Sequence, residues 1–506
     1  MKNLIVYPFV LTVFILLFSC RKDFSTIPST SSNLIFSTDT VFLDTVFSNI
    51  STSTYTLKVY NNSSDDIHIP SISLLRANSF YRLNVDGLPG TRFKNVPLRA
   101  KDSLFIFIEG TINYSSTDPL YVDAIIFDSG DKSENVDLIT LVQDAHFIYV
   151  NNQTDLKSVK PYFKPESDSL KIHYLTNAEI LFCNDTSDEK SIVFYGYCGV
   201  EANKTLTIAA NKRLYFHKNS ALVIEKDARL IVNGTLDEKV LIEGDRLEPA
   251  FSETPGQWDA IWLRAGSKSN EINYLNSRNS TFGIICDSVS SDNSTPTLTL
   301  KNTELYNNSE VGLLANQSHI IAENVVIGNS RTASFKVING GTYDFNHSTL
   351  ANYWSESIRR GNTIQISNIN SNEELESQVL NLTANFTNTI IDGNNSKEIY
   401  FEKNKNDTFD FLFQNCLIKY DGTSEDPLYD FTDTDNYLDI EENTTADYLD
   451  TSLNKFEIGA DSELIDKADD TNAARTPIDI IGEDRTLAPD IGAYQNIIFP
   501  EEEAKE

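Results

Sequence analysis

Cysteine is scarce in this chain of 506 residues, and none of its five cysteines forms a CxxC pair. Zinc ribbons and thioredoxin-like redox sites need such pairs, so the sequence predicts no metal site, no redox motif and no cofactor. Cys183 and Cys198 flank a short β-rich run. In an oxidising compartment these two could form a disulfide, and two reduced cysteines inside a core are the alternative.

Basic residues are also few, with 41 Lys and Arg against 73 Asp and Glu and a formal net charge of -32. Nucleic acids bind proteins largely through Lys and Arg contacts to phosphates, and a strongly acidic surface repels them. We therefore expect no nucleic-acid partner. The same charge opposes adsorption to an anionic membrane surface.

The N-terminal hydrophobic run, Leu4 to Phe18, is shorter than the roughly 20 apolar residues of a membrane-spanning helix. It follows Lys2, and a short apolar run behind a basic residue is typical of an export signal. The run ends in LFSC, residues 17–20, which resembles the lipobox of bacterial lipoproteins.

The lipobox resemblance implies that residues 1–19 are a signal peptide and that Cys20 is acylated, with cleavage just before it. A triacylated cysteine provides more than the two signals that stable anchoring requires. We therefore expect a lipid anchor at Cys20, a Ser/Thr/Pro-rich tether over 20–32 and a soluble body behind it. The expected location is the outer membrane, at the cell surface or on the periplasmic face.

Residues 33–148 contain short runs of alternating apolar and polar residues, such as Asp102 to Ile112 and Tyr121 to Gly130, separated by turn residues. This alternation and spacing predict a β-sandwich. The order of the runs resembles the Ig-like domains that bacteria place ahead of repeat arrays. We place an Ig-like sandwich at 33–148 and a connector at 149–194.

An internal repeat begins at about residue 195. Five segments align on one position with steps of 22, 23, 41 and 27 residues; the aligned residues are Asn302, Asn324, His347, Asn388 and Asn415. The apolar alternation slips phase there, which indicates a corner. An asparagine can adopt a left-handed backbone at a corner while its amide bonds to the next coil. Asn307, Asn329 and Asn352 predict a second corner column.

Two apolar columns flank the first corner and must face one core. The residues two positions before it are Leu300, Ala322, Phe345, Phe386 and Phe413. The residues three positions after it are Leu305, Ile327, Leu350, Ile391 and Ile418. We therefore predict a right-handed parallel β-helix over 195–425, with the 41-residue step formed by two coils. A β-sandwich or jelly roll built from the same short strands is the alternative.

The C-terminal part contains three motifs, at Glu425–Phe431, Asn454–Asp469 and Asp479–Gln495. Their order resembles the end of bacterial β-helix proteins with a choice-of-anchor Q ending. A solenoid leaves an open strand edge and apolar surface on its last coil, so a cap is needed there. We expect the final coils and the cap at 426–496, followed by an acidic tail at 497–506.

Many parallel β-helices are polysaccharide lyases or hydrolases, whose chemistry needs acids, bases or a metal on an outer face. The acids of the aligned coils, however, occupy different columns: Glu304, Glu323, Asp344, Asp392 and Asp410. Stacking of coils therefore creates no carboxylate pair, and a pair between columns or from loops is the alternative. We assign no catalytic residue. Within the C-terminal ending, we expect Asp490, Gly492 and Tyr494 to shape the cap.

The stretch from His347 to Asn362 concentrates aromatic, acidic and basic residues. If Trp354 is exposed beside Arg359 and Arg360, it could stack on a sugar while the arginines bind uronate carboxylates. Tyr353 extends this candidate glycan-binding platform. The alternative is that Trp354 packs inside the long coil and that the arginines offset the acidity of the chain.

These features predict an all-β, lipid-anchored cell-envelope protein in which an Ig-like spacer precedes a capped β-helix. We expect a non-catalytic binding or structural module with a glycan as its candidate ligand. The expected partners are the membrane, through Cys20, and a polysaccharide or another envelope protein. The competing hypothesis is a β-helix polysaccharide lyase or glycoside hydrolase.

We predict that Cys20→Ala releases the protein from membranes without unfolding it, because both predicted domains bury their cores independently of the lipid. Membrane fractionation and circular dichroism test this. A Cys20→Ala protein that stays in the outer-membrane pellet after a high-salt wash would contradict the lipoprotein hypothesis.

Overall fold

The computed structural model describes residues 26–30, 34–115, 118–129, 132–150, 157–164, 169–287, 295–369 and 379–500. The chain divides into two compact units, Met1–Gln143 and Asp144–Glu506. Strands dominate both units, so the expected all-β class is confirmed. The proposed anchor Cys20 lies outside the described residues. No helix within the described ranges is long and apolar enough to cross a membrane.

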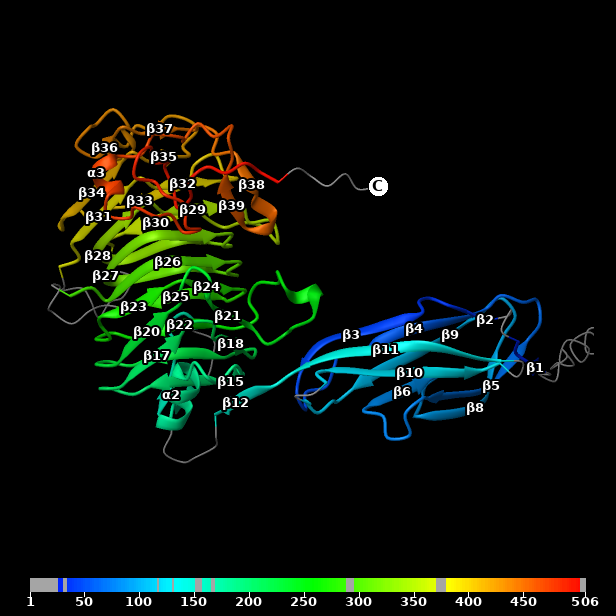
Figure 1. The fold of residues 1–506 in the computed structure, drawn as a ribbon. Helices are drawn as coiled ribbons and strands as arrows, with labels where there is room; N and C mark the ends of the chain where they lie inside the picture. The colour runs from blue at the N-terminus through cyan, green and yellow to red at the C-terminus, as the bar shows by residue number, and fades with distance from the viewer. Residues whose placement is uncertain are drawn as a thin grey trace, which may run out of the picture. The chain divides into compact units, whose positions relative to one another are not determined.

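The first unit is a sandwich of two sheets (Figure 1). One sheet has the order β1 (Ile27–Pro28), β5 (Ile67–Leu74), β10 (Leu120–Asp128), β11 (Ser133–Gln143) and β3 (Thr40–Phe47), with β8 (Arg92–Leu98) beside β5. The other has the order β2 (Leu34–Phe36), β4 (Tyr55–Asn61), β9 (Ser103–Gly110), β6 (Tyr81–Val85) and β7 (Leu88–Gly90). Alternate residues of each strand, such as Ile106 and Ile108 of β9, are buried in one shared core. The predicted sandwich is confirmed.

The second unit is a parallel β-helix, in which the strands of successive turns pair in parallel (Figure 1). Its turns build three faces. Face 1 contains β12 (Ala145–Tyr149), β15 (Ser191–Tyr195), β18 (Arg213–Phe216), β21 (Val240–Gly244), β24 (Leu275–Arg278), the ends of β26 (Leu298–Tyr306) and β27 (Val311–Gly328), β29 (Thr349–Asn352), β32 (Ile390–Gly393), β35 (Leu417–Ile418) and β37 (Glu441–Glu442).

Face 2 contains β14 (Leu170–Tyr174), β16 (Tyr197–Val200), β19 (Ala221–Ile224), β22 (Ala260–Leu263), β25 (Phe282–Cys286), the start of β27, the start of β28 (Ala333–Asn346), β30 (Ile364–Ser367) and β33 (Ile399–Glu402). Face 3 contains β17 (Thr205–Ala209), β20 (Arg229–Asn233), β23 (Asn270–Asn273), the start of β26, the middle of β27, the end of β28, β31 (Leu382–Thr387), β34 (Phe409–Gln414) and β36 (Tyr437–Leu438).

Strand register confirms both predicted inward columns. On face 3, Leu300 pairs with Ala322, which pairs with Phe345, then Phe386 and Phe413, and all five are fully buried. The ring of Phe386 stacks between those of Phe345 and Phe413, at centroid distances of 5.1 and 4.8 Å. On face 1 the second column pairs in the same way: Leu305, Ile327, Leu350, Ile391 and Ile418.

The predicted corner lies between face 3 and face 1. Its residues, Asn302, Asn324, His347, Asn388 and Asn415, all have left-handed backbones, with φ from 45° to 53°. Asn324 donates from Nδ2 to the side-chain oxygen of Asn302 at 2.9 Å, and Asn388 Nδ2 lies 2.9 Å from His347 Nε2. These side chains bond between coils at a point where the strand ladder is interrupted. In the second column Asn307 and Asn329 are also left-handed, whereas Asn352 continues β29.

Two predictions about the coils are corrected. The 41-residue step is one long coil and not two, because Phe345 pairs directly with Phe386. The extra residues form a loop at 353–363 and the stretch between β30 and β31. The β-helix also begins before residue 195, since β12 already pairs with β15. The predicted sandwich, 33–148, included most of β12, because periodicity does not show which strand a segment pairs with.

The first coils are closed by α2 (Asn177–Asn184), which begins with a capping box between Thr176 and Glu179. Phe182 of α2 stacks on the His146 ring at 3.9 Å. Cys183 and Cys198 are buried and free, so they are reduced core cysteines and not a disulfide. The antiparallel pair of β13 (Ser158–Val159) with β14 lies in the segment before this helix.

The C-terminal region closes the solenoid at its end and along one side. At the end, η3 (Pro427–Tyr429) and the Phe431 ring follow the last full coil, and Phe431 packs 4.7 Å from Tyr437. The chain then returns over face 1 through β38 (Tyr448–Asp450), η4 (Thr451–Leu453), β39 (Lys455–Ile458) and α3 (Asp470–Ala473). It completely buries four outward residues of the later face 1 strands: Val326, Ala351, Ile390 and Leu417. The predicted cap therefore also covers a side face. A further 3-10 turn, η1 (Pro249–Phe251), lies in the loop after β21.

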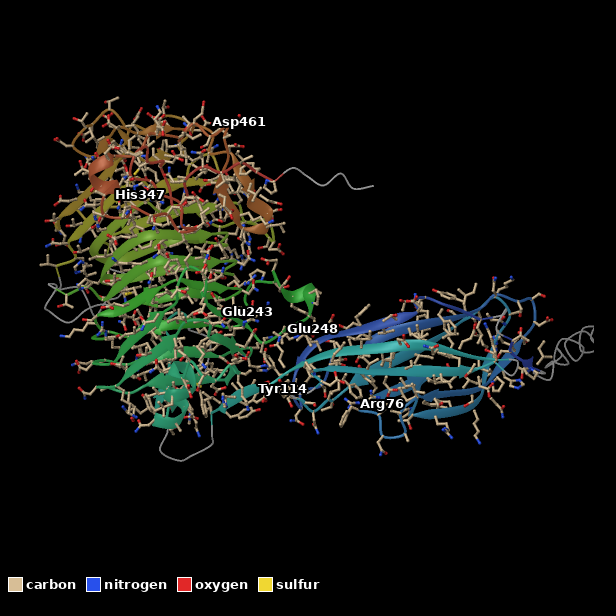
Figure 2. The ribbon with its side chains drawn as sticks, viewed as in Figure 1. Arg76, Tyr114, Glu243, Glu248, His347 and Asp461 are labelled. Carbon is tan, nitrogen blue, oxygen red and sulfur yellow. The ribbon has the colours of Figure 1, made fainter. Side chains whose placement is uncertain are left out.

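The residues of the C-terminal ending make structural contacts. Gly492 has φ 114°, its N–H donates to Asn388 O at 2.9 Å, and a Cβ there would lie 2.6 Å from Ile390. His347, which is labelled in Figure 2, has its Nδ1 3.2 Å from the backbone oxygen of Gly492. Burial holds the His347 pKa well below its usual value. Asp490 is fully buried and accepts the backbone N–H groups of Asp466 and Asn496.

We predict that Phe386→Asp unfolds the β-helix, because the new carboxylate would have no partner in a dry column and would cost several kcal/mol. Asn394→Asp is the control, since Asn394 is exposed in a turn and an aspartate there keeps the oxygen that accepts the Arg359 hydrogen bond. Thermal unfolding followed by circular dichroism measures both. Equal melting temperatures would show that the coil register is wrong.

Candidate functional site

The loop at 353–363 carries the residues that the sequence put forward for glycan binding. The Trp354 side chain is inside the fold, with the residue only 5% exposed, and its Nε1–H donates to Ser357 Oγ at 3.1 Å. The Tyr353 hydroxyl donates to Asp392 at 2.7 Å, and desolvation by burial, together with this carboxylate, raises the Tyr353 pKa. Trp354 therefore packs, as the alternative had it, and offers no stacking platform.

Arg359 of the same loop is also inside the fold. Its side chain is 5% exposed and forms an ion pair with Glu398, whose side chain is fully buried. Only Arg360 of the four predicted residues is exposed. The structure thus brings Tyr353, Trp354 and Arg359 together as packing residues of one loop.

Face 2 is covered over its earlier coils. Its outward residues Val223, Trp262 and Ile285 are buried in a cluster with Val159 and Phe163 of the segment 157–164, and the Phe163 ring packs 5.1 Å from Trp262. Asp287 binds this segment through a hydrogen bond from Tyr162.

Three donors reach the buried Asp287 carboxylate. Tyr162 and Asn316 Nδ2 donate to one oxygen, at 2.9 and 3.3 Å, and Trp262 Nε1–H donates to the other at 2.7 Å. Desolvation by burial raises the Asp287 pKa. The Tyr162 hydrogen bond therefore helps to hold residues 157–164 against the earlier coils of face 2.

The same outward column continues into the later coils of face 2. Strand register places Leu314 below Lys336, Lys336 below Gln365 and Gln365 below Tyr400. Leu314 is buried, Lys336 and Gln365 are half-buried, and Tyr400 is 43% exposed. The column therefore changes from apolar to polar where the cover ends.

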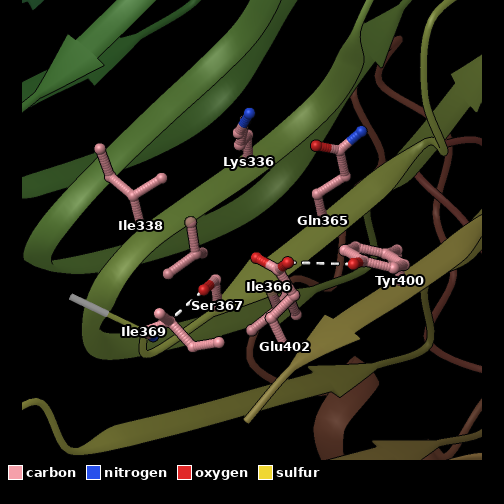
Figure 3. Close-up of a pocket in the computed structure, with 9 residues that line it drawn as sticks. Lys336, Ile338, Gln365, Ile366, Ser367, Ile369, Tyr400 and Glu402 are labelled. Atoms are coloured by element: carbon pink, nitrogen blue, oxygen red, sulfur yellow. Dashed lines mark hydrogen bonds between the residues drawn. The ribbon is translucent and has the colours of Figure 1, made fainter. Parts of the chain in front are cut away.

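These polar residues line a cavity of about 270 Å³ (Figure 3). Ile338, Ser367 and Glu402 form the next outward column, and Ile369 closes one side. The cavity thus combines an ammonium, an amide, a hydroxyl, a phenol and apolar side chains on neighbouring strands. Such a mixture suits a ligand with both hydroxyl groups and apolar C–H surface.

The two charged residues of the cavity, Glu402 and Lys336, differ in their hydrogen-bond and ion-pair partners. The Tyr400 hydroxyl donates to Glu402 at 3.0 Å, and this hydrogen bond raises the Tyr400 pKa (Figure 3). The Glu402 carboxylate is therefore engaged. Lys336 has no acid within ion-pair distance in the part of the chain that the structure describes. Among the described residues that line the cavity, Lys336 is the one cation.

The acids of the aligned coils do not gather at this cavity. Glu323 and Asp344, from adjacent columns of face 3, meet at Arg475 of the C-terminal segment, at 3.2 and 2.9 Å. Their charges are engaged by a cation, and Lys301 also pairs with Glu323 at 2.9 Å. Among the described residues, no group of three or more His, Cys, Asp or Glu is arranged to hold a metal ion.

The sequence did not single out the cavity residues. Their signal is the alternation in SFKVI, IQIS and IYFE, where outward positions turn polar. Aligning these strands required the true length of the long coil, because two coils in place of one shift Gln365 and Tyr400 out of the Lys336 column.

Comparisons with known proteins add little to this geometry. No protein-family model matches the chain. The curated proteins contain no match either. A solved structure of a family 123 glycoside hydrolase from Clostridium perfringens aligns with 22% of this chain and 25% of its own length, at 12% identity and a TM-score of 0.16.

We predict that Trp354→Ala lowers the free energy of unfolding by about 3–5 kcal/mol, the usual cost of removing a large buried aromatic side chain. Ser357→Ala is the matched control, because it removes the partner of the indole N–H and leaves the ring in place. Chemical denaturation measures both variants. Wild-type stability of Trp354→Ala would show that the indole is not part of the core.

Proposed function

We propose that this chain is a non-catalytic glycan-binding module of the cell envelope, tethered through a lipid on Cys20. The polysaccharide lies along face 2, over the column of Lys336, Gln365 and Tyr400. The single observation that supports this proposal is the change of one outward column from covered and apolar to open and polar. The lipid tether rests on the sequence resemblance of residues 17–20.

The geometry of the column favours an extended ligand. Adjacent parallel strands are about 4.8 Å apart, so the column presents a polar side chain at that interval along the solenoid axis. A linear sugar chain offers hydroxyl groups at intervals of a few ångströms. The Lys336 ammonium and Gln365 amide donate hydrogen bonds, while Ile338 and Ile369 offer apolar contact.

The chemistry of the cavity favours binding over cleavage. Acid–base hydrolysis of a glycoside uses two carboxyl groups on either side of the scissile bond. Glu402 is the only carboxylate among the described residues that line the cavity, and it accepts the Tyr400 hydrogen bond. A lyase or hydrolase is accordingly the second candidate, to be tested by product analysis in the binding assay.

We predict that Lys336→Met weakens oligosaccharide binding about tenfold, because hydrogen bonds to charged groups contribute about 1.5–3 kcal/mol. Isothermal titration calorimetry with hexagalacturonate and cellohexaose measures this, and the same mixtures are examined for unsaturated or reducing ends. Lys218→Met, at an exposed position in an earlier coil, is the matched control.

Binding of neither sugar by the wild-type protein would contradict the glycan proposal. Release of new chain ends by the wild-type protein would replace binding with catalysis. Equal loss of affinity in Lys218→Met would show that Lys336 acts only through the general charge of the protein.

A further inference from the structure

We infer that the Arg359–Glu398 ion pair is a positioning device for the face 2 cavity, holding the strands that carry Gln365 and Tyr400. Neither Arg359 nor Glu398 lines the cavity. The inference rests on the proposed glycan function of that cavity. Arg359 thus contributes to binding from within the fold, whereas the sequence had placed it on the ligand.

Glu398 stands immediately beside the cavity residues. It precedes Tyr400 by two positions, as Thr363 precedes Gln365, and the register of Ile364 with Ile399 places Glu398 directly above Thr363. Thr363 and Glu398 immediately precede β30 and β33, so they lie next to each other at the start of the two strands that carry Gln365 and Tyr400.

The Glu398 carboxylate is fully buried and accepts several hydrogen bonds. It accepts the backbone N–H of Thr363 at 2.9 Å and that of Asn395 at 2.8 Å. A buried carboxylate needs a countercharge, because desolvation of an unpaired ion costs several kcal/mol. Arg359 is that countercharge, and its guanidinium contacts both carboxylate oxygens.

Arg359 also joins segments from successive coils. Its Nη1 donates to the backbone oxygen of Asn352 and to the side-chain oxygen of Asn394, both at 2.7 Å. Its Nη2 donates to Thr363 Oγ1 at 3.1 Å. A guanidinium is planar and holds its donors in a fixed fork, which a lysine ammonium cannot reproduce. The loop at 353–363 is thereby fixed to the coil that follows it.

The C-terminal end of the loop at 353–363 determines the position of the Gln365 side chain. Asn395 donates to the Gly361 oxygen at 2.9 Å, so the turn beside Glu398 also holds Gly361. Gly361 lies so close to the Gln365 amide that any Cβ there would clash with it. The Gln365 amide in turn donates to the Thr332 oxygen of the preceding coil at 3.3 Å. Movement of the loop would consequently move an amide that lines the cavity.

Arg359→Lys tests the inference, because it keeps the charge and removes the fork. Arg264→Lys is the matched control. Arg264 also contacts both oxygens of a glutamate, Glu225, at 2.8 and 2.9 Å, in earlier coils of the same face. Both variants are studied at 20 °C by titration with hexagalacturonate and by hydrogen–deuterium exchange. We expect Arg359→Lys to remain folded, to bind about tenfold more weakly and to exchange faster in β30 and β33. Arg264→Lys should stay within twofold of wild type in both measurements.

The double variant Arg359→Met with Glu398→Leu removes both charges and the need for a countercharge. We expect it to fold and still to bind weakly, because the hydrogen bonds to Asn352, Thr363 and Asn394 are lost. Wild-type affinity of this variant, or unchanged exchange of β30 and β33 in Arg359→Lys, would overturn the inference. If the wild-type protein does not bind hexagalacturonate, the exchange result still decides the positioning role, and only the glycan function fails.

Discussion

Parallel pairing between successive coils is the constraint on which the rest of this structure depends. Each residue of a coil lies over its counterpart in the coil before, so side chains inherit both their direction and their neighbours. The column of Phe345, Phe386 and Phe413 shows the inward result, with rings stacked at about the spacing of the strands. Left-handed corner residues such as Asn324 and Asn388 allow each turn without disturbing that register.

Outward side chains are stacked into columns by the same parallel pairing, but these columns face solvent. An apolar outward column, repeated over several coils, would expose a continuous apolar surface, which soluble proteins rarely tolerate. Two segments outside the coils remove it. Residues 157–164 cover the earlier part of face 2, and the returning C-terminal chain covers much of face 1. Among the described residues, the part of face 2 that remains open is the one where Lys336, Gln365 and Tyr400 make the outward column polar. The site and the covers are therefore two outcomes of one column arrangement.

Periodicity in the sequence was sufficient to predict the inward columns, the corner residues and the need for a C-terminal cap. It could not show that Trp354 is buried, because burial of an outward residue depends on segments from other parts of the chain. The ion pair of Arg359 with Glu398 could not be predicted either. The long coil that contains Arg359 was predicted as two coils, so Glu398 was not expected in the coil directly next to it. The place of the cap was missed for a related reason. The apolar outward residues Val326 and Ile390 belong to different coils and form one surface only after the register is known.

The open column also bears on how an acidic protein could hold a polysaccharide. With a net charge of -32, the protein repels anionic polymers at long range, and screening at physiological salt limits that repulsion to about 8 Å. Inside that distance the local groups decide, and Lys336 is a cation whose nearest strand neighbours are an amide and an apolar residue. One ammonium supplies little affinity. A linear ligand that contacts Lys336, Gln365 and Tyr400 together adds contacts within a single molecule, so each further contact forms at a high effective concentration. The fixed spacing of the coils is what makes these contacts simultaneous, and any device that holds neighbouring strands in place, as Arg359 does, therefore acts on all of them at once.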